Sequence, residues 1–225
     1  MIKNNCAILT GGCPQGNPHS IKNAVILGAL DAEQHSEGIP RFIGIMPYNG
    51  KQNFTFESLT SRQLIIHTDL SSLDRDPING TTPDILICFD GGPGTICELA
   101  FGIALGRHAI FHRHSAQNLL EKCDKSKRTE IKQILTAVAH KWRTHLQMPD
   151  GGADGMMNIL RDYLLQATNR STLTSSTDIV NAALKLLPTQ LSNIPSFPGV
   201  LDSQRKQQQQ NQFAEYWTSI SNDNV

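Results

Sequence analysis

The segment DGGPGT, residues 90–95, has the composition of a loop that can bind a phosphate group. Its glycines, Gly91, Gly92 and Gly94, follow a short apolar run and precede an apolar segment with helical spacing. The free N–H groups and the dipole at the start of a helix favour an anion, and glycines let a ligand approach the main chain closely. The alternative is a tight strand-to-helix turn in which backbone angles alone require glycine. No Lys-Ser or Lys-Thr pair follows, so the segment is not a Walker A loop.

Glu98 is an acid inside an otherwise apolar helical segment, and two roles fit its position. The spacing Thr95-x-x-Glu98 is that of a capping box, in which the glutamate accepts a hydrogen bond from the backbone N–H of Thr95. The other role is that of a catalytic carboxylate beside a bound ligand. The local pattern alone does not separate these two roles.

Other residues with reactive side chains give weaker signals. His112 and His114 form an HxH pair, but no third ligand lies at a suggestive spacing, so surface histidines are favoured over a metal site. Cys97 lies at a helix start, where a thiol pKa can be lowered, although packing against the sheet is the favoured role. The 5 cysteines are odd in number and lack CxxC spacing, which favours reduced thiols in a cytosolic protein.

Short, continuous apolar runs predict strands that are buried on both faces of a parallel sheet. Five such runs occupy residues 6–10, 42–46, 64–68, 84–89 and 108–112. Asn17 and Pro18 have the residue types of a helix N-cap and a first helical position, and a second helix is predicted to begin near Gly94 or Thr95.

Strands that alternate with helices predict an α/β fold with a doubly wound parallel sheet. Ligands of such sheets bind beyond the carboxyl ends of the strands. Gly11 and Gly12 follow the first predicted strand, and the glycines of residues 91–94 follow the fourth. Both glycine segments are therefore predicted to bind a nucleotide.

The second half of the chain has a more helical pattern. Helices are predicted over residues 115–123, 127–147, 156–167 and 178–187, the last with Thr177 as its cap. From Pro188 the composition changes to Pro, Ser and Gln and includes the run KQQQQNQ. This composition predicts a nucleotide-binding domain over residues 1–187 and a flexible tail over residues 188–225.

Charge and hydropathy exclude two classes of partner for this chain of 225 residues. The 20 Lys and Arg residues balance the 20 Asp and Glu residues, so neither nucleic acid nor a membrane surface is an expected partner. No stretch reaches the roughly 20 apolar residues of a membrane span, and a signal-peptide pattern is missing. A soluble, cytoplasmic protein is expected.

Four segments together resemble the Lonely Guy (LOG) family of Rossmann-like nucleotide-binding proteins, whose relatives are often mislabelled lysine decarboxylases. They are LTGGCPQG, RFIGIMP, DRDPINGTTPD and FDGGPGTICELA. The family motif PGGxGTxxE corresponds to DGGPGTICE, and the family's arginine, 15 positions before the motif, corresponds to Arg75. The residues that agree in spacing are Arg75, Asp84, Gly91, Gly92, Gly94, Thr95 and Glu98. The resemblance covers about residues 6–112.

The resemblance implies a phosphoribohydrolase activity that requires no cofactor. In this family the GGxGT turn holds the 5'-phosphate of a nucleoside monophosphate. The arginine and the glutamate, here Arg75 and Glu98, flank the N-glycosidic bond, and its hydrolysis releases a free base and ribose 5-phosphate. Relatives assemble through helices next to the active site, so a homodimer or a higher homo-oligomer is expected.

Three departures from the family pattern bear on this expectation. Asp90 replaces the proline of the motif, so its negative charge must point away from a phosphate or meet a cation. Asp76 replaces a lysine that often follows the arginine. The chain also begins at what resembles the family's second strand, so the first strand and helix, normally central, are expected to be absent. A partner, the tail or the remaining strands would then fill the gap.

Two other functions remain open at this point. One is a non-catalytic nucleotide-binding or sensing domain of the same superfamily. The other is a carrier of a phosphorylated cofactor such as molybdenum cofactor. Pyridoxal-dependent lysine decarboxylation is disfavoured, because no lysine lies where the phosphate turn could present a Schiff base.

Overall fold

The computed structural model describes residues 6–11, 21, 24–28, 41–48, 63–168 and 173–193. Gly12, the predicted helix start at Asn17 and Pro18, and the predicted tail from residue 194 onward lie outside these ranges. Residues 24–28 are helical, in the region where the sequence predicts the first helix. None of the helices in the described ranges is long and apolar enough to cross a membrane.

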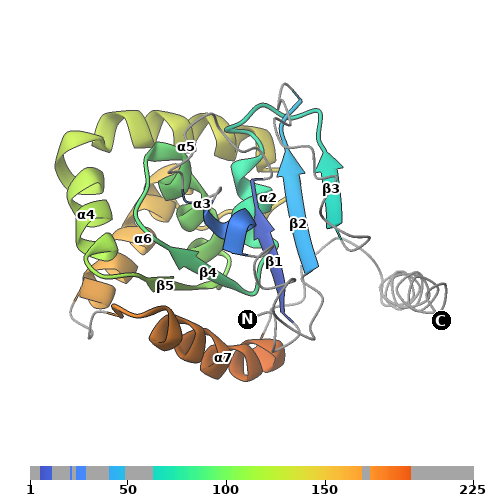
Figure 1. The fold of residues 1–225 in the computed structure, drawn as a ribbon. Coiled ribbons are helices and arrows are strands. Elements are labelled where there is room, and N and C mark those ends of the chain that lie inside the picture. Colours follow the sequence, from blue (N-terminus) through green and yellow to red (C-terminus); the bar gives the residue numbers. More distant parts are fainter. Residues whose placement is uncertain are drawn as a thin grey trace. The chain divides into compact units, whose positions relative to one another are not determined.

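The structure confirms the five predicted strands, with bounds that differ by one residue or so. They are β1 (Ala7–Thr10), β2 (Arg41–Met46), β3 (Gln63–His67), β4 (Ile85–Cys88) and β5 (His108–Phe111). Every pairing is parallel, and the strands form one sheet in the order β1-β2-β3 and a second sheet of β4 and β5 (Figure 1). Among the described residues, no strand pairing joins the two sheets.

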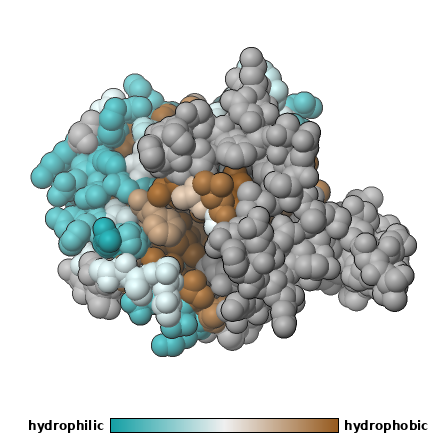
Figure 2. Space-filling view, viewed as in Figure 1, coloured by the Kyte–Doolittle hydropathy of each residue, from teal (hydrophilic) through white to brown (hydrophobic). Residues whose placement is uncertain are grey.

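The helices confirm an α/β fold of the Rossmann-like type with a helical C-terminal part. They are α2 (Asp76–Thr81), α3 (Pro93–Ala104), α4 (Ser115–Glu121), the π-helical turn Lys122–Ser126, α5 (Arg128–Trp142), α6 (Gly152–Thr168) and α7 (Ser176–Asn193). The sequence did not predict α2. In Figure 2 hydrophilic residues cover the surface over α4 and α5, and apolar residues gather near the centre of the view.

The sheet of β4 and β5 is covered by helices on both faces. Leu86 and Cys88 of β4 pack into the main core, which also contains apolar side chains of α3, α4, α5 and α6. Ile85 and Ile87 lie on the other face and pack with Ile179 and its neighbours on α7. Because successive strand residues face opposite sides, this alternation explains the continuous apolar run that predicted the strand.

The start and the end of α7 differ from the prediction. The hydroxyl of Ser175 accepts a hydrogen bond from the N–H of Asp178 and donates one to its carboxylate, so Ser175, and not Thr177, caps the helix. The helix continues through Pro188 to Asn193. The helix thus ends beyond the predicted end at residue 187, and the predicted domain boundary at that residue stays a prediction.

Helices α2 and α3 approach each other closely through glycine. A Cβ atom on Gly80 of α2 would lie 2.1 Å from the carbonyl oxygen of Glu98, and one on Gly102 of α3 would lie 2.5 Å from the carbonyl oxygen of Gly80. Backbone therefore packs on backbone where the two helices cross. This contact fixes the position of Glu98 relative to α2.

Replacement of either contact glycine by alanine is expected to force α2 and α3 apart. We expect Gly80→Ala and Gly102→Ala each to lower the free energy of unfolding by about 1–3 kcal/mol, the range for an overpacked core. Gly28→Ala is the matched control, because Gly28 is helical and a Cβ there meets nothing within 4 Å. Urea denaturation would measure the three changes, and equal stability of the Gly80→Ala and Gly28→Ala variants would contradict the close contact.

Candidate functional site

Helix α3 begins at Pro93 and leaves two backbone N–H groups unbonded at its N-terminus. Gly92 is the N-cap, in an extended conformation, and no side chain of the described residues caps the helix. Pro93 has no N–H, and the N–H of Ile96 donates to the carbonyl of Gly92. The N–H groups of Gly94 and Thr95 have no partner in the described part of the chain, so they are available to an anion.

The capping-box role of Glu98 is wrong. Thr95 is the third residue of α3 rather than its cap, because the helix starts two residues earlier, at Pro93. The carboxylate of Glu98 instead accepts a hydrogen bond of 2.8 Å from Nδ2 of Asn79, on α2. This bond holds one carboxylate oxygen and leaves the other without a hydrogen bond to the described residues.

Asn79 was not singled out from the sequence. Its side chain is 5% exposed, and its Oδ1 atom is buried without a hydrogen bond to any described group. Asn79 follows Arg75 by four residues and therefore lies on the same face of α2, which is the one signal that could have identified it. A buried amide oxygen without a partner, next to Glu98, is typical of a site that a ligand or water completes.

Arg75 is buried and joins the carboxyl ends of two strands. It is 3% exposed, and its Nη1 atom donates to the carbonyl of Gly11, at 2.5 Å, and to that of Ile45, at 2.6 Å. Its Nε atom is buried and has no hydrogen bond to the described residues. No ion pair links Arg75 to Glu98 in the described part of the chain. The two residues are linked indirectly, because Arg75 is the N-cap of α2 and Asn79 of the same helix donates a hydrogen bond to Glu98.

The structure therefore brings together most of the predicted site residues, but in two groups. Arg75 and Gly11 meet at the ends of β1 and β2. Glu98 shares α3 with Gly94 and Thr95, and Gly91 and Gly92 precede this helix. Gly12 lies outside the described residues. The direct contact of each of these residues with a ligand stays a prediction.

The three glycines of the turn have different surroundings. A Cβ atom on Gly91 would lie 2.4 Å from Cβ of Thr95, so Gly91 covers the Thr95 side chain and has no room for a larger residue. A Cβ on Gly92 would meet nothing within 4 Å. A Cβ on Gly94 would lie 3.5 Å from Oδ2 of Asp76, an ordinary van der Waals contact. Packing thus requires Gly91, whereas Gly92 and Gly94 leave room beside the N-terminus of α3.

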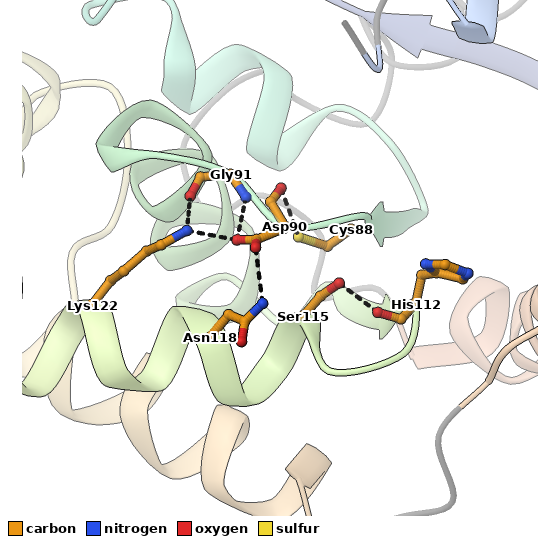
Figure 3. Close-up of polar contacts among 7 residues, drawn as sticks. All are labelled: Cys88, Asp90, Gly91, His112, Ser115, Asn118 and Lys122. Atoms are coloured by element: carbon orange, nitrogen blue, oxygen red, sulfur yellow. Dashed lines mark hydrogen bonds and ion pairs between the residues drawn. The ribbon is translucent and has the colours of Figure 1, made fainter. Parts of the chain in front are cut away.

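Asp90 forms an ion pair with Lys122, which is one of the two arrangements expected for its charge from the sequence. Its Oδ1 accepts hydrogen bonds of 2.7 Å from Nζ of Lys122 and from the N–H of Gly91, and its Oδ2 accepts one of 3.0 Å from Nδ2 of Asn118 (Figure 3). Lys122 also donates to the carbonyl of Gly91. Partial burial alone would raise the pKa of Asp90, but the bonds from Lys122, Gly91 and Asn118 together lower it.

The cysteines near the site are neutral core residues. Burial raises the pKa of Cys88 to about 12, and burial together with the charges of Asp76 and Glu98 raises the pKa of Cys97 still further above its usual range. Both side chains are packed in the main core. A thiolate nucleophile at the start of α3 is therefore not formed near neutral pH.

The lowered pKa of Asp90 predicts a pH-dependent contribution to stability. Above about pH 4, the ordinary pKa of an unfolded aspartate, Asp90 is ionised in both states and its hydrogen bonds contribute fully. As the pH falls through the lowered pKa of the folded protein, this contribution is lost. We expect the stability difference between wild type and Asp90→Asn to be largest above pH 5 and to shrink towards pH 2, measured by urea denaturation. A difference that stays constant over this range would contradict the ion pair.

Comparisons with known proteins place the chain in a family. A search of curated proteins and a search of solved structures each found no match. The family model described as the SLOG cluster4 family matches residues 1–139, a segment that runs from before β1 into α5. Its superfamily includes LOG-like Rossmann proteins and indicates a nucleotide-related function, although the match does not identify the LOG family itself. The match covers more than half of the 225 residues, and the chain belongs to the SLOG cluster4 family.

Proposed function

We propose that this protein binds a nucleoside 5'-monophosphate and hydrolyses its N-glycosidic bond. The observation that carries the proposal is the N-terminus of α3, where the N–H groups of Gly94 and Thr95 have no partner among the described residues. A phosphate would accept hydrogen bonds from both groups and would also interact favourably with the dipole of the 12-residue helix. Gly92 and Gly94 leave space for its approach.

Glu98 is the residue that we assign to the reaction. Helical side chains point back towards the N-terminus, so the carboxylate of Glu98 covers the turn that begins at Gly94 and Thr95. A nucleotide with its phosphate on these N–H groups would extend its ribose towards Glu98. The carboxylate takes a proton from a water molecule whose oxygen bonds to the anomeric carbon. The bond from this carbon to the base nitrogen breaks, its electron pair stays on the nitrogen, the nitrogen takes up a proton from solvent, and Glu98 returns its own proton to solvent. The products are a free base and ribose 5-phosphate.

Arg75 is assigned a positioning role in this proposal. Its contacts with the carbonyls of Gly11 and Ile45 hold the ends of β1 and β2 beside α2. Asn79, one turn further along α2, then orients Glu98. Arg75 supports the reaction through these contacts, and its direct contact with the ligand stays a prediction.

One observation favours a second candidate, a sensing domain that binds a nucleotide without hydrolysing it. The carboxyl group of Asp76 lies beside Gly94, and the guanidinium group of Arg75 is already bonded to the main chain. Among the described residues Arg75 therefore makes no hydrogen bond or ion pair with Glu98, although these two residues would act as a pair in the hydrolase, and Asp76 adds negative charge near the phosphate position. A phosphorylated-cofactor carrier would use the same phosphate site.

Release of base from AMP, CMP, GMP and UMP, without added cofactor, distinguishes these candidates. We expect Glu98→Gln to lower turnover by about 100-fold or more, the range for loss of a positioned acid or base. The amide oxygen can still accept the bond from Asn79, so the melting temperature should stay the same. Glu130→Gln, which alters an exposed ion pair on α5, is the matched control and should retain full turnover.

Two results would contradict the proposed reaction. If wild type binds a monophosphate tightly but releases no base, the protein is a sensor or carrier. If Glu98→Gln releases base as fast as wild type, Glu98 is not the catalytic carboxylate.

The phosphate position is tested separately by Gly94→Val. The added side chain would fill the space beside the N-terminus of α3, while its Cβ meets only Asp76 at an ordinary distance. We therefore expect the thermal stabilisation by a bound monophosphate to be lost, with little change in the melting temperature of the free protein. Gly91→Ala, in contrast, should lower the melting temperature of the free protein, because the added Cβ would collide with the side chain of Thr95. Unchanged stabilisation of Gly94→Val by the ligand would place the phosphate elsewhere.

A further inference from the structure

The turn before α3 contains an acid, Asp90, close to the N-terminus of the helix, where the phosphate group of the proposed ligand would add further negative charge. Asp90 has a φ angle of 86°, in the left-handed region that residues other than glycine rarely adopt. Such conformations persist only where the surroundings enforce them, and they cluster at functional sites. Here the carboxylate of Asp90 occupies the N–H of Gly91, so this donor is not available to a ligand.

Lys122 compensates this charge at the turn. Its Nζ atom lies 2.7 Å from Oδ1 of Asp90 and 2.7 Å from the carbonyl oxygen of Gly91 (Figure 3). Among the described residues, no other cationic side chain makes a hydrogen bond or an ion pair with residues 90–95. The nearest alternative cation by sequence resemblance, Arg75, is bonded to the carbonyls of Gly11 and Ile45 instead.

The position of Lys122 depends on an unusual helical turn. Lys122 is the first residue of the π-helical turn Lys122–Ser126, which directly follows α4. Turns of this type are rare and are frequent at functional sites. Asn118 lies four residues before Lys122, so both side chains leave the same face of the helix and reach Asp90 together. The buried side chain of Cys123 anchors the turn in the main core.

We propose that Lys122 is the residue that makes this site selective for phosphorylated ligands. It neutralises Asp90 in the free protein and balances the charge of a phosphate held by the N–H groups of Gly94 and Thr95. The inference rests on the proposed nucleotide binding, and it adds a specificity residue from a part of the chain outside the glycine turn. The Oδ1 atom of Asn79, beside Glu98, is buried and has no hydrogen bond to the described residues, which is an independent indication that a ligand belongs at this edge of α3.

The charge of Lys122 predicts a defined pattern of affinities. Without Lys122 the carboxylate of Asp90 would repel a phosphate at short range, which corresponds to a loss of about 10-fold or more in affinity. A nucleoside without a phosphate would not experience this repulsion. If both charges are removed together, the repulsion and the compensation disappear at the same time, so the affinity should be largely restored.

The experiment compares wild type, Lys122→Met, Asp90→Asn and the double variant by isothermal titration calorimetry. The ligands are AMP, CMP, GMP and UMP, the four corresponding nucleosides, and inorganic phosphate. We expect Lys122→Met to bind monophosphates at least 10-fold more weakly and nucleosides as well as wild type does. Asp90→Asn should bind monophosphates about 3-fold to 10-fold more tightly, and the double variant should come within about 3-fold of wild type.

Two further variants separate charge from folding. Lys127→Met is the matched control, because the exposed Nζ atom of Lys127 also forms an ion pair, with Glu130, but makes no hydrogen bond or ion pair with the described residues 90–95. It should bind every ligand as wild type does. Lys122→Arg keeps the charge and should keep the preference for monophosphates, even if the melting temperature of Lys122→Met falls.

Several outcomes would overturn the inference. They are an equal loss of nucleoside and monophosphate affinity in Lys122→Met, a double variant as weak as Lys122→Met, and an equal loss in Lys127→Met. If the Lys122 and Asp90 variants show the expected affinities but wild type releases no base, the hydrolysis proposal falls and the inference about Lys122 stands. If wild type releases base and Lys122→Met binds monophosphates as wild type does, the hydrolysis proposal stands and the inference about Lys122 falls. If no monophosphate and no inorganic phosphate binds to wild type, both proposals fall.

Discussion

The buried guanidinium group of Arg75 connects the parts of this fold that strand pairing leaves separate. Strands β1 and β4 do not pair, so within the described residues the sheet of β1, β2 and β3 shares no ladder with the sheet of β4 and β5. Arg75 caps α2, and α2 packs closely on α3, which belongs to the core of the second sheet. Its bonds to Gly11 and Ile45 reach the first sheet. Because a buried charge is costly unless it is hydrogen-bonded, these two carbonyls and Arg75 depend on each other.

Contacts from α5 hold the segment that leads into Arg75. The carboxylate of Asp74 accepts hydrogen bonds from Lys141 and from the hydroxyl of Ser71, and its carbonyl accepts one from Nε1 of Trp142. Burial alone would raise the pKa of Asp74, but these side-chain bonds lower it, so the carboxylate is charged near neutral pH. The helical C-terminal part thereby helps to place the N-terminus of α2.

The sequence predicted the elements well and the contacts between them poorly. The apolar runs identified every strand, and helices cover both faces of the sheet of β4 and β5, as continuous apolar runs predict. Burial on both faces was wrong for β3, whose Leu64 and Ile66 are 38% and 40% exposed. Helix α2 was missed because it is short and contains Pro77 and Gly80, two residues of low helix propensity. The start of α3 was placed too late, although Pro93 is well suited to the first helical position.

The partners of the site residues could not be predicted for a different reason. Asn79 contacts Glu98 only because Gly80 and Gly102 allow α2 and α3 to touch, and Lys122 lies 32 residues after Asp90 in the sequence. Neither pair has a spacing that a local pattern can reveal. The resemblance to the LOG family identified Arg75 and Glu98 by their spacing, and it marked Asp90 as a departure from the motif. It contains no information on Lys122, which lies beyond the residues that the resemblance covers.

The turn before α3 is held in place by the protein itself. The N–H of Gly91 is bonded to Asp90, Asp90 to Lys122 and Asn118, and Lys122 to the carbonyl of Gly91. A ligand therefore need not order the turn when it binds, which reduces the entropy cost of association. The same bonds use one of the donors that a phosphate turn offers and add a carboxylate nearby. In the proposed site, preorganisation is thus coupled to charge, and the affinity for an anion would depend on how completely Lys122 offsets Asp90.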